Sequence, residues 1–119
     1  MSQESAKKTT DKINLEEIVK LANKIGLEYV AAKKEAEYLE LMKSPTKAKI
    51  ALRLESKEIS ETKLKRLTEA DPEYIEHIIK LTKAKEKAEQ LKIRYESYKN
   101  LFDARRSMLS YQKEEMKLL

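Results

Sequence analysis

The residues best suited to chemistry in this sequence are the lysines and arginines in the middle of the chain. Residues 43–66 carry eight Lys or Arg against three Glu, a net charge of +5 that equals the net charge of the whole protein. A concentrated basic segment is typical of polyanion-binding proteins, because each neutralised phosphate releases counterions. The predicted nucleic-acid-binding residues are Lys47, Lys49, Arg53, Lys43 and Lys57. The alternative is that these side chains only keep an exposed amphipathic helix soluble.

Residue types that catalyse reactions or bind metals are not grouped in this sequence. The chain has no Cys and one His, and it contains no Gly-rich phosphate loop and no Asp-x-Asp pair. The single histidine, His77, stands on a predicted helical seam, so it is expected to pack or to pair with a neighbour. We therefore expect no enzymatic activity, no cofactor and no metal site.

A long helix over residues 72–117 is the element that must position the basic segment. Asp71 can accept a hydrogen bond from an amide of the first turn, and Pro72 suits the first helical position. Seam positions then follow at intervals of three and four without a Gly or Pro. At ~1.5 Å per residue the helix is on the order of 65 to 70 Å long, so its seam must pack against other helices of this chain or of neighbouring subunits. The seam reads Tyr74, His77, Leu81, Ala84, Ala88, Leu91, Tyr95, Tyr98, Phe102, Arg105, Leu109, Gln112 and Met116.

Three shorter helices are predicted before the long one. The first spans residues 14–43, with Asn14 as its cap and a seam at positions 15, 18, 22, 25, 29, 32, 36 and 39. The basic helix spans residues 45–57 and a short helix spans residues 60–70. Residues 1–13 are predicted to be a disordered tail, because they are polar and aperiodic. The fold class is thus all-α: residues 14–119 form a single domain, an elongated helical hairpin or coiled-coil-like bundle of three to four helices with one long C-terminal helix.

The start of the basic helix and the orientation of its side chains can also be predicted. Ser44 and Pro45 repeat the pattern of a cap followed by proline that is seen at Asp71. Ile50, Leu54 and the two alanines Ala48 and Ala51 are expected to be buried. The basic side chains Lys47, Lys49, Arg53 and Lys57 are expected to fan outward.

The composition predicts assembly into an oligomer. The chain has 119 residues, of which 40% are hydrophobic and 39% are charged, and the apolar residues form stripes that a single chain covers poorly. The residues predicted to form the oligomer interface are Leu91, Tyr95, Tyr98, Phe102 and Leu109. No window approaches ~18 consecutive apolar residues and the N-terminus lacks a signal peptide core, so we expect a cytoplasmic protein that does not enter a membrane.

One stretch of the chain resembles a known family. Lys47-Ala48-Lys49-Ile50, within TKAKIALRLE, is followed about 20 residues later by LTEADPEYIEHI and then by one long helix. This arrangement, over roughly residues 28–112, resembles the phage recombination mediator family typified by UvsY. The chain departs from the family in its very short connection before Asp71, which contains no Gly.

The resemblance implies a small all-helical protein that assembles into a ring-like oligomer and binds single-stranded DNA without sequence preference. It further implies that the protein helps to load a recombinase in place of a single-strand-binding protein, in the cytoplasm of the host cell if a phage encodes it. Lys47 and Lys49 match the DNA-binding motif of the family. The alternative hypothesis is a structural or adaptor coiled-coil protein whose long helix pairs with a partner helix.

Overall fold

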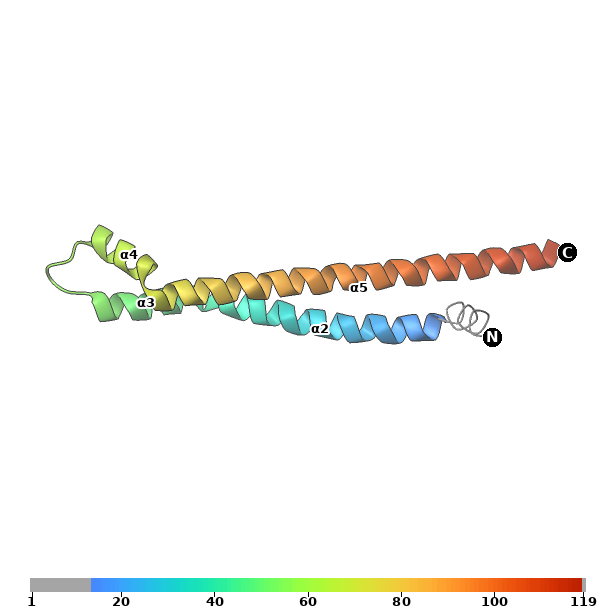
Figure 1. The fold of residues 1–119 in the computed structure, drawn as a ribbon, viewed down its shortest axis with the longest axis horizontal. Coiled ribbons are helices and arrows are strands. Elements are labelled where there is room, and N and C mark those ends of the chain that lie inside the picture. Colours follow the sequence, from blue (N-terminus) through green and yellow to red (C-terminus); the bar gives the residue numbers. More distant parts are fainter. Residues whose placement is uncertain (1–13, 119) are drawn as a thin grey trace, which may run out of the picture. The chain divides into compact units, whose positions relative to one another are not determined.

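The computed structural model describes residues 14–118, and this part of the chain is built from helices and short connections (Figure 1). The helices are α2 (Leu15–Leu41), α3 (Lys43–Leu54), α4 (Glu61–Ala70) and α5 (Pro72–Leu118). They confirm the predicted all-α class with one long C-terminal helix. The predicted tail at residues 1–13 lies outside the described residues. Within residues 14–118, every helix is too short or too polar to cross a membrane.

The chain divides into two compact units. One contains the described residues 14–29 and 90–118, and the other contains residues 30–89. Helices α2 and α5 each contribute to both units. The single domain expected over residues 14–119 stays a prediction.

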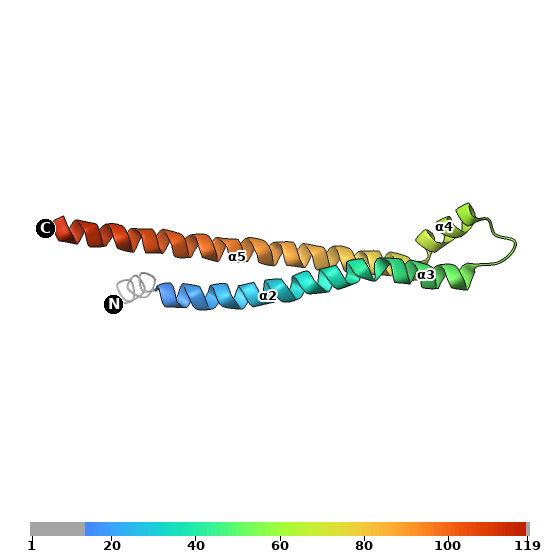
Figure 2. The ribbon, with the colours of Figure 1, turned by 180° about the vertical axis from the view of Figure 1, so that it is seen from behind.

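The unit of residues 30–89 is the one that holds the basic segment. Its buried apolar residues are Ala32, Ala36, Ile50, Tyr74, Leu81 and Ala88. All of them except Ile50 lie on the two predicted seams, which confirms the seams in this unit. Helices α3 and α4 lie side by side in both views, joined by residues 55–60 (Figures 1 and 2). Ile50 is fully buried and anchors α3.

The unit of residues 14–29 and 90–118 packs the first half of α2 against α5. Ile18 is fully buried and Leu91 is 8% exposed, and every predicted seam position of α2 in this unit is shielded from solvent. Along α5 the shielding continues through Arg105 and then stops, because Leu109 and the later seam positions are exposed. The predicted seam of α5 is therefore confirmed only as far as Arg105.

Side-chain caps fix the starts of three helices. Asn14 Oδ1 accepts from the Glu17 amide at 2.9 Å, and Asp71 Oδ1 accepts from the Glu73 amide at 2.9 Å. Both caps were predicted from the sequence. Ser60 Oγ accepts from the Lys63 amide at 3.2 Å and begins α4 after the connection. These bonds satisfy amides of the first turn that have no partner inside their own helix.

The junction between α2 and α3 differs from the prediction. Helix α3 begins at Lys43 and has no side-chain cap, so the predicted role of Ser44 as a cap is wrong. The helical path is nearly continuous here, because the Met42 amide donates to the Tyr38 carbonyl at 2.9 Å and the Thr46 amide donates to the Met42 carbonyl at 3.0 Å. Pro45 has no N–H to donate, which explains a break confined to one residue.

A side chain of α5 supports this junction. The Leu39 carbonyl oxygen lies 2.7 Å from Nε2 of His77. A histidine donor near the end of a helix is favourable, because the last carbonyl groups of a helix lack intrahelical partners. The predicted pairing role of His77 is thus confirmed.

Candidate nucleic-acid interface

The predicted basic helix corresponds to α3, whose orientation is set by its few apolar side chains. Ile50 is fully buried, and Ala51 and Leu54 are half-buried. Ala48 is exposed, so the prediction that it is buried is wrong. Helical spacing then turns Lys47 and the cations beyond it toward the junction between α4 and α5, where three acidic side chains lie.

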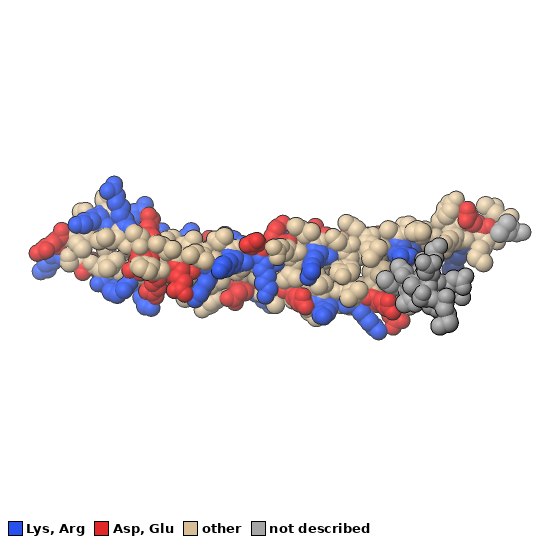
Figure 3. Space-filling view, viewed as in Figure 1, with Lys and Arg blue, Asp and Glu red and all other residues tan. Residues whose placement is uncertain are grey.

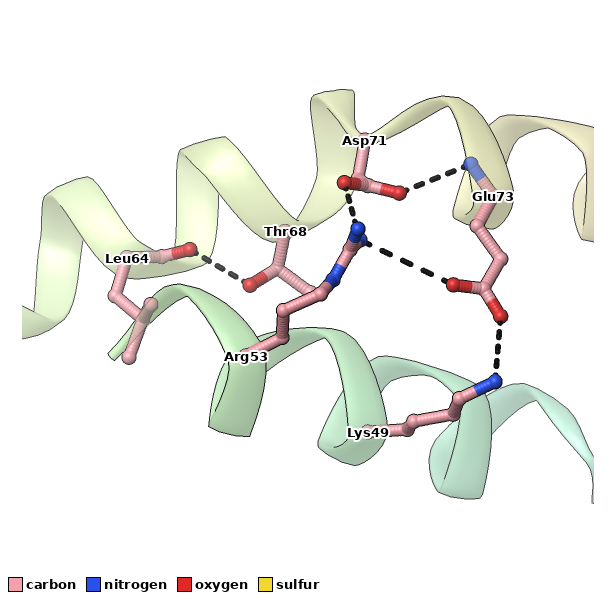
Figure 4. A network of polar contacts seen from close by, with 6 residues as sticks. All are labelled: Lys49, Arg53, Leu64, Thr68, Asp71 and Glu73. Carbon is pink, nitrogen blue, oxygen red and sulfur yellow. Dashed lines mark hydrogen bonds and ion pairs between the residues drawn. The ribbon is translucent and has the colours of Figure 1, made fainter.

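Three cations of α3 form ion pairs with that junction. Lys49 Nζ lies 3.0 Å from an oxygen of Glu73, and Lys47 Nζ lies 3.4 Å from an oxygen of Glu69. The Arg53 guanidinium donates to Asp71 Oδ2 at 2.7 Å and lies 3.9 Å from the second oxygen of Glu73. Figure 4 shows Arg53 between the two carboxylates, with Lys49 on the far side of Glu73.

Asp71 has two roles in this network. One of its oxygens accepts from Arg53 while the other caps the first turn of α5, and its side chain is only 12% exposed. The neighbouring Thr68 is buried and donates its hydroxyl to the Leu64 carbonyl at 2.8 Å. Low exposure reduces screening by water, so the bond between Arg53 and Asp71 is the best protected of these ion pairs.

Lys47 has an aromatic neighbour in addition to its carboxylate partner. Its Nζ lies 5.1 Å from the centre of the buried Tyr74 ring, within the range of a cation–π contact. Burial opposes the charged form of the lysine, but the Tyr74 phenol and the Glu69 carboxylate outweigh this effect and raise the pKa of Lys47. Lys47 is thus a half-buried cation that already has two partners within the chain.

Lys49 and Arg53 are exposed, as predicted, whereas Lys47 is half-buried. The prediction did not include their ion pairs, because each of the three cations is paired with an acidic residue 18 to 24 positions later in the chain. The other two predicted binding residues differ from them: Lys43 is half-buried at the start of α3, and Lys57 is exposed in the connection after it. Neither makes an ion pair with another residue in the described range 14–118.

The exposed cations of α4 were not singled out from the sequence. Leu64 and Thr68 face α3, so helical spacing turns Lys63 and Arg66 to the opposite side, with Lys65 at the flank. Within the part of the chain that the structure describes, these three cations form no ion pair. Figure 3 shows Lys and Arg side chains gathered over α4 and the adjoining part of α3. The low exposure of Leu64 and Thr68, which are four residues apart, identifies the side of α4 that faces α3 and therefore the side on which the cations lie.

An open groove of about 300 Å³ lies between α3 and α4. Ala48, Ala51 and Leu64 supply its apolar lining, and Lys65 and Glu61 lie among its charged residues. Among residues 14–118, no group of three or more His, Cys, Asp or Glu side chains is arranged to hold a metal ion. The apolar lining of the groove can accept an apolar group beside charges, while Lys63 and Arg66 lie outside the groove.

The residues predicted to form an oligomer interface divide into two groups. Leu91 is already buried in a single chain, and Tyr95 packs over Gly26 of α2. Tyr98 and Phe102 are half-buried, and Leu109 is 51% exposed. Leu91 and Tyr95 therefore have a packing role within the chain, whereas Leu109 is accessible to a second molecule.

Comparisons with protein-family models, with curated proteins and with solved structures found no match to this chain.

Proposed function

We propose that this protein is a non-enzymatic accessory factor of homologous recombination that binds single-stranded DNA without sequence preference. The observation that supports this function is a set of five cations in residues 43–66 with no acidic partner among the described residues. They are Lys43, Lys57, Lys63, Lys65 and Arg66. Cations of this kind bind phosphates, which are the same for every base sequence. The role in loading a recombinase rests on the resemblance to the UvsY-type mediators.

The ion pairs of α3 determine which cations are assigned to DNA. Extending the basic segment to residue 73 adds Glu69, Asp71 and Glu73 and lowers the net charge from +5 to +2. A phosphate that binds Lys47, Lys49 or Arg53 would have to compete with these carboxylates for the cation. The cations of α4 have no such competitor among the described residues, so α4 is assigned the main phosphate contacts.

A second candidate function is a structural or adaptor coiled-coil protein. Large apolar side chains remain exposed on α5 from residue 93 onward, among them Ile93, Leu101, Met108 and Tyr111. Exposed apolar residues at helical spacing are typical of surfaces that pair with other helices. In this case the cations of α4 would only be solvated.

The test is binding of a fluorescent single-stranded oligonucleotide at several salt concentrations, with the triple variant K63A/K65A/R66A. Loss of three phosphate contacts should make the slope of log K against log salt shallower by roughly 2, at ~0.7 per contact. The loss of affinity should be equal for oligonucleotides of different sequence, since phosphate contacts do not specify bases. Alanine is the best helix former, so the helicity of α4 should be retained.

The matched control is K47A/K49A/R53A, which removes the same number of charges from α3. It should keep the wild-type salt slope but unfold at a lower temperature, because its ion pairs hold α3 to the start of α5. The opposite result would be a shallower slope of log K against log salt for the α3 variant and an unchanged slope for the α4 variant. It would place the binding site on α3, as predicted from the sequence. Absence of binding by the wild-type protein at low salt would leave the adaptor function as the better account.

A further inference from the structure

Helix α5 carries a second apolar seam beside the one that packs against α2. With Ala88 and Leu91 as heptad positions a and d, positions g and c form another row with intervals of three and four. The centre of this row is apolar, and its members from residue 94 onward are Arg94, Ser97, Leu101, Ala104, Met108, Tyr111, Glu115 and Leu118. We call residues 94–118 at these positions the second seam.

No described element of the chain covers the second seam. Leu101 is 41% exposed, Met108 is 56% exposed and Tyr111 is 66% exposed, although all three are large and apolar. In the same unit α2 already occupies the first seam, where Leu91 is buried and the Tyr95 ring lies against Gly26. A helix with two apolar seams is suited to two different neighbours, so the second seam requires a further helix.

The charges at the ends of the second seam point to a second copy of the same chain. Arg94 precedes the apolar centre and Glu115 follows it, and in the described range neither forms an ion pair. A parallel pair of copies would place Arg94 beside Arg94 and Glu115 beside Glu115. An antiparallel pair places Arg94 of each copy near Glu115 of the other.

The order of side chains is also symmetric about Ala104. Leu101 and Met108 lie at nearly equal intervals on either side of it, as do Arg94 and Glu115. A two-fold axis near Ala104 would thus bring Leu101 of one copy against Met108 of the other, with the smallest side chain where the helices cross.

We propose that two copies of this chain associate in antiparallel orientation through the second seam of α5, with Arg94 and Glu115 paired at both ends. This interface differs from the predicted one, which used Leu91, Tyr95, Tyr98, Phe102 and Leu109. It also stands apart from the proposed DNA contact, because residues of α4 take no part in it. Loss of the dimer and loss of DNA binding can therefore be measured separately.

The first test is the mass of the protein in sedimentation at tens of micromolar, with L101E/M108E as the disrupting variant. Wild-type protein should be a dimer or a multiple of it, and the variant should lose the association because two carboxylates per copy would be buried without partners. S110E is the matched control, since Ser110 is exposed outside both seams. Circular dichroism checks that the variants remain helical. A monomeric wild-type protein would overturn the proposal and leave the seam to a different partner.

The second test uses exposed charged residues, whose replacement should leave the packing of α5 against α2 intact. R94E and E115R should each weaken the dimer by about tenfold, because each creates two like-charge contacts in the antiparallel arrangement. The double variant R94E/E115R should regain the wild-type dissociation constant, since the pairs re-form with reversed sign. Single variants with wild-type affinity would contradict the antiparallel pairing, because Arg94 and Glu115 would then not face each other across the interface.

The third test fixes the orientation by disulfide formation. The chain has no cysteine, so any cross-link comes from the introduced one. A104C should cross-link two copies near the axis, whereas S97C should not, because its two sites lie about 22 Å apart along an antiparallel pair. Cross-linking of both variants would show a parallel pair, and cross-linking of neither would place the interface elsewhere.

Discussion

The single glycine of the chain is explained by one aromatic ring. A Cβ atom built on Gly26 would lie 3.2 Å from Cε1 and 3.5 Å from Cδ1 of Tyr95. Gly26 lies within α2, where glycine costs ~1 kcal/mol relative to alanine. The close approach of the ring explains why glycine stands here despite this cost. A Cβ atom would make a contact of 3.2 Å, which is tighter than ordinary van der Waals packing.

We predict that G26A gains less stability than helix propensity alone would give. The gain of ~1 kcal/mol should be offset by the displacement of the Tyr95 ring, so that the free energy of unfolding in urea changes by less than ~0.5 kcal/mol. In the background Y95A the same substitution should gain the full ~1 kcal/mol. A full gain from G26A in the wild-type background would mean that the ring yields without cost.

At the scale of the elements, the attachment of α3 to α5 depends on Asp71. The Asp71 amide donates to the Thr68 carbonyl at the end of α4, and its side chain caps α5 and accepts from Arg53, so one residue links three helices. Glu73 adds contacts to Lys49 and Arg53 from the first turn of α5. Surface ion pairs contribute ~0 to 1 kcal/mol each, and the low exposure of Asp71 places its bond at the upper end.

We predict that D71N and D71A differ in a way that separates the two roles of Asp71. Asparagine is as good a cap as aspartate, so D71N should lose only the charge on the bond to Arg53, at ~1 kcal/mol. D71A should lose the cap as well and cost ~2 kcal/mol. Urea unfolding monitored by circular dichroism gives both values. Equal effects of the two substitutions would contradict the capping role.

The helices could be predicted from the sequence better than the candidate site. The seams of both long helices repeat every three or four residues, and every predicted seam position of α2, and of α5 from Tyr74 to Arg105, is shielded from solvent. The cap at Asp71 is equally local. Pro45 correctly indicated a break in the helix. The break itself lies at Met42, because backbone hydrogen bonds continue the helical path on both sides of that residue.

The ion pairs of α3 could not be found in this way. Lys47 and Glu69 are 22 positions apart, and Lys49 and Glu73 are 24 positions apart. Their pairing depends on the turn between α3 and α4, which local periodicity does not describe. For the same reason the sequence assigned DNA binding to α3 rather than to Lys63, Lys65 and Arg66 of α4.

At the scale of the whole molecule, ion pairs make stability depend on pH. Lys85 Nζ lies 3.0 Å from Glu40 and connects α5 to α2. The hydrogen bond and the positive charge of Lys85 lower the pKa of Glu40 below its usual 4.5. A carboxyl group whose pKa is lower in the folded state stabilises that state above the unfolded pKa, and the contribution is lost as pH falls through the folded value.

We predict that E40Q removes part of the acid sensitivity of the protein. Between neutral pH and pH values below 4.5, the free energy of unfolding of the wild type should fall more than that of E40Q, because only the wild type loses the contact between Glu40 and Lys85. Urea unfolding at several pH values measures this difference. E37Q is the control, since Glu37 is an exposed residue of the same helix. Parallel pH profiles of wild type and E40Q would argue against a contribution from Glu40.

The bond between His77 and Leu39 has a consequence for the tautomer of the only imidazole in the chain. A carbonyl oxygen can only accept, so Nε2 of His77 must carry the hydrogen that lies between them. In the neutral ring this leaves Nδ1 without a hydrogen, so Nδ1 is an acceptor while Nε2 is the donor. The bond to α2 therefore selects one of the two tautomers of the neutral imidazole.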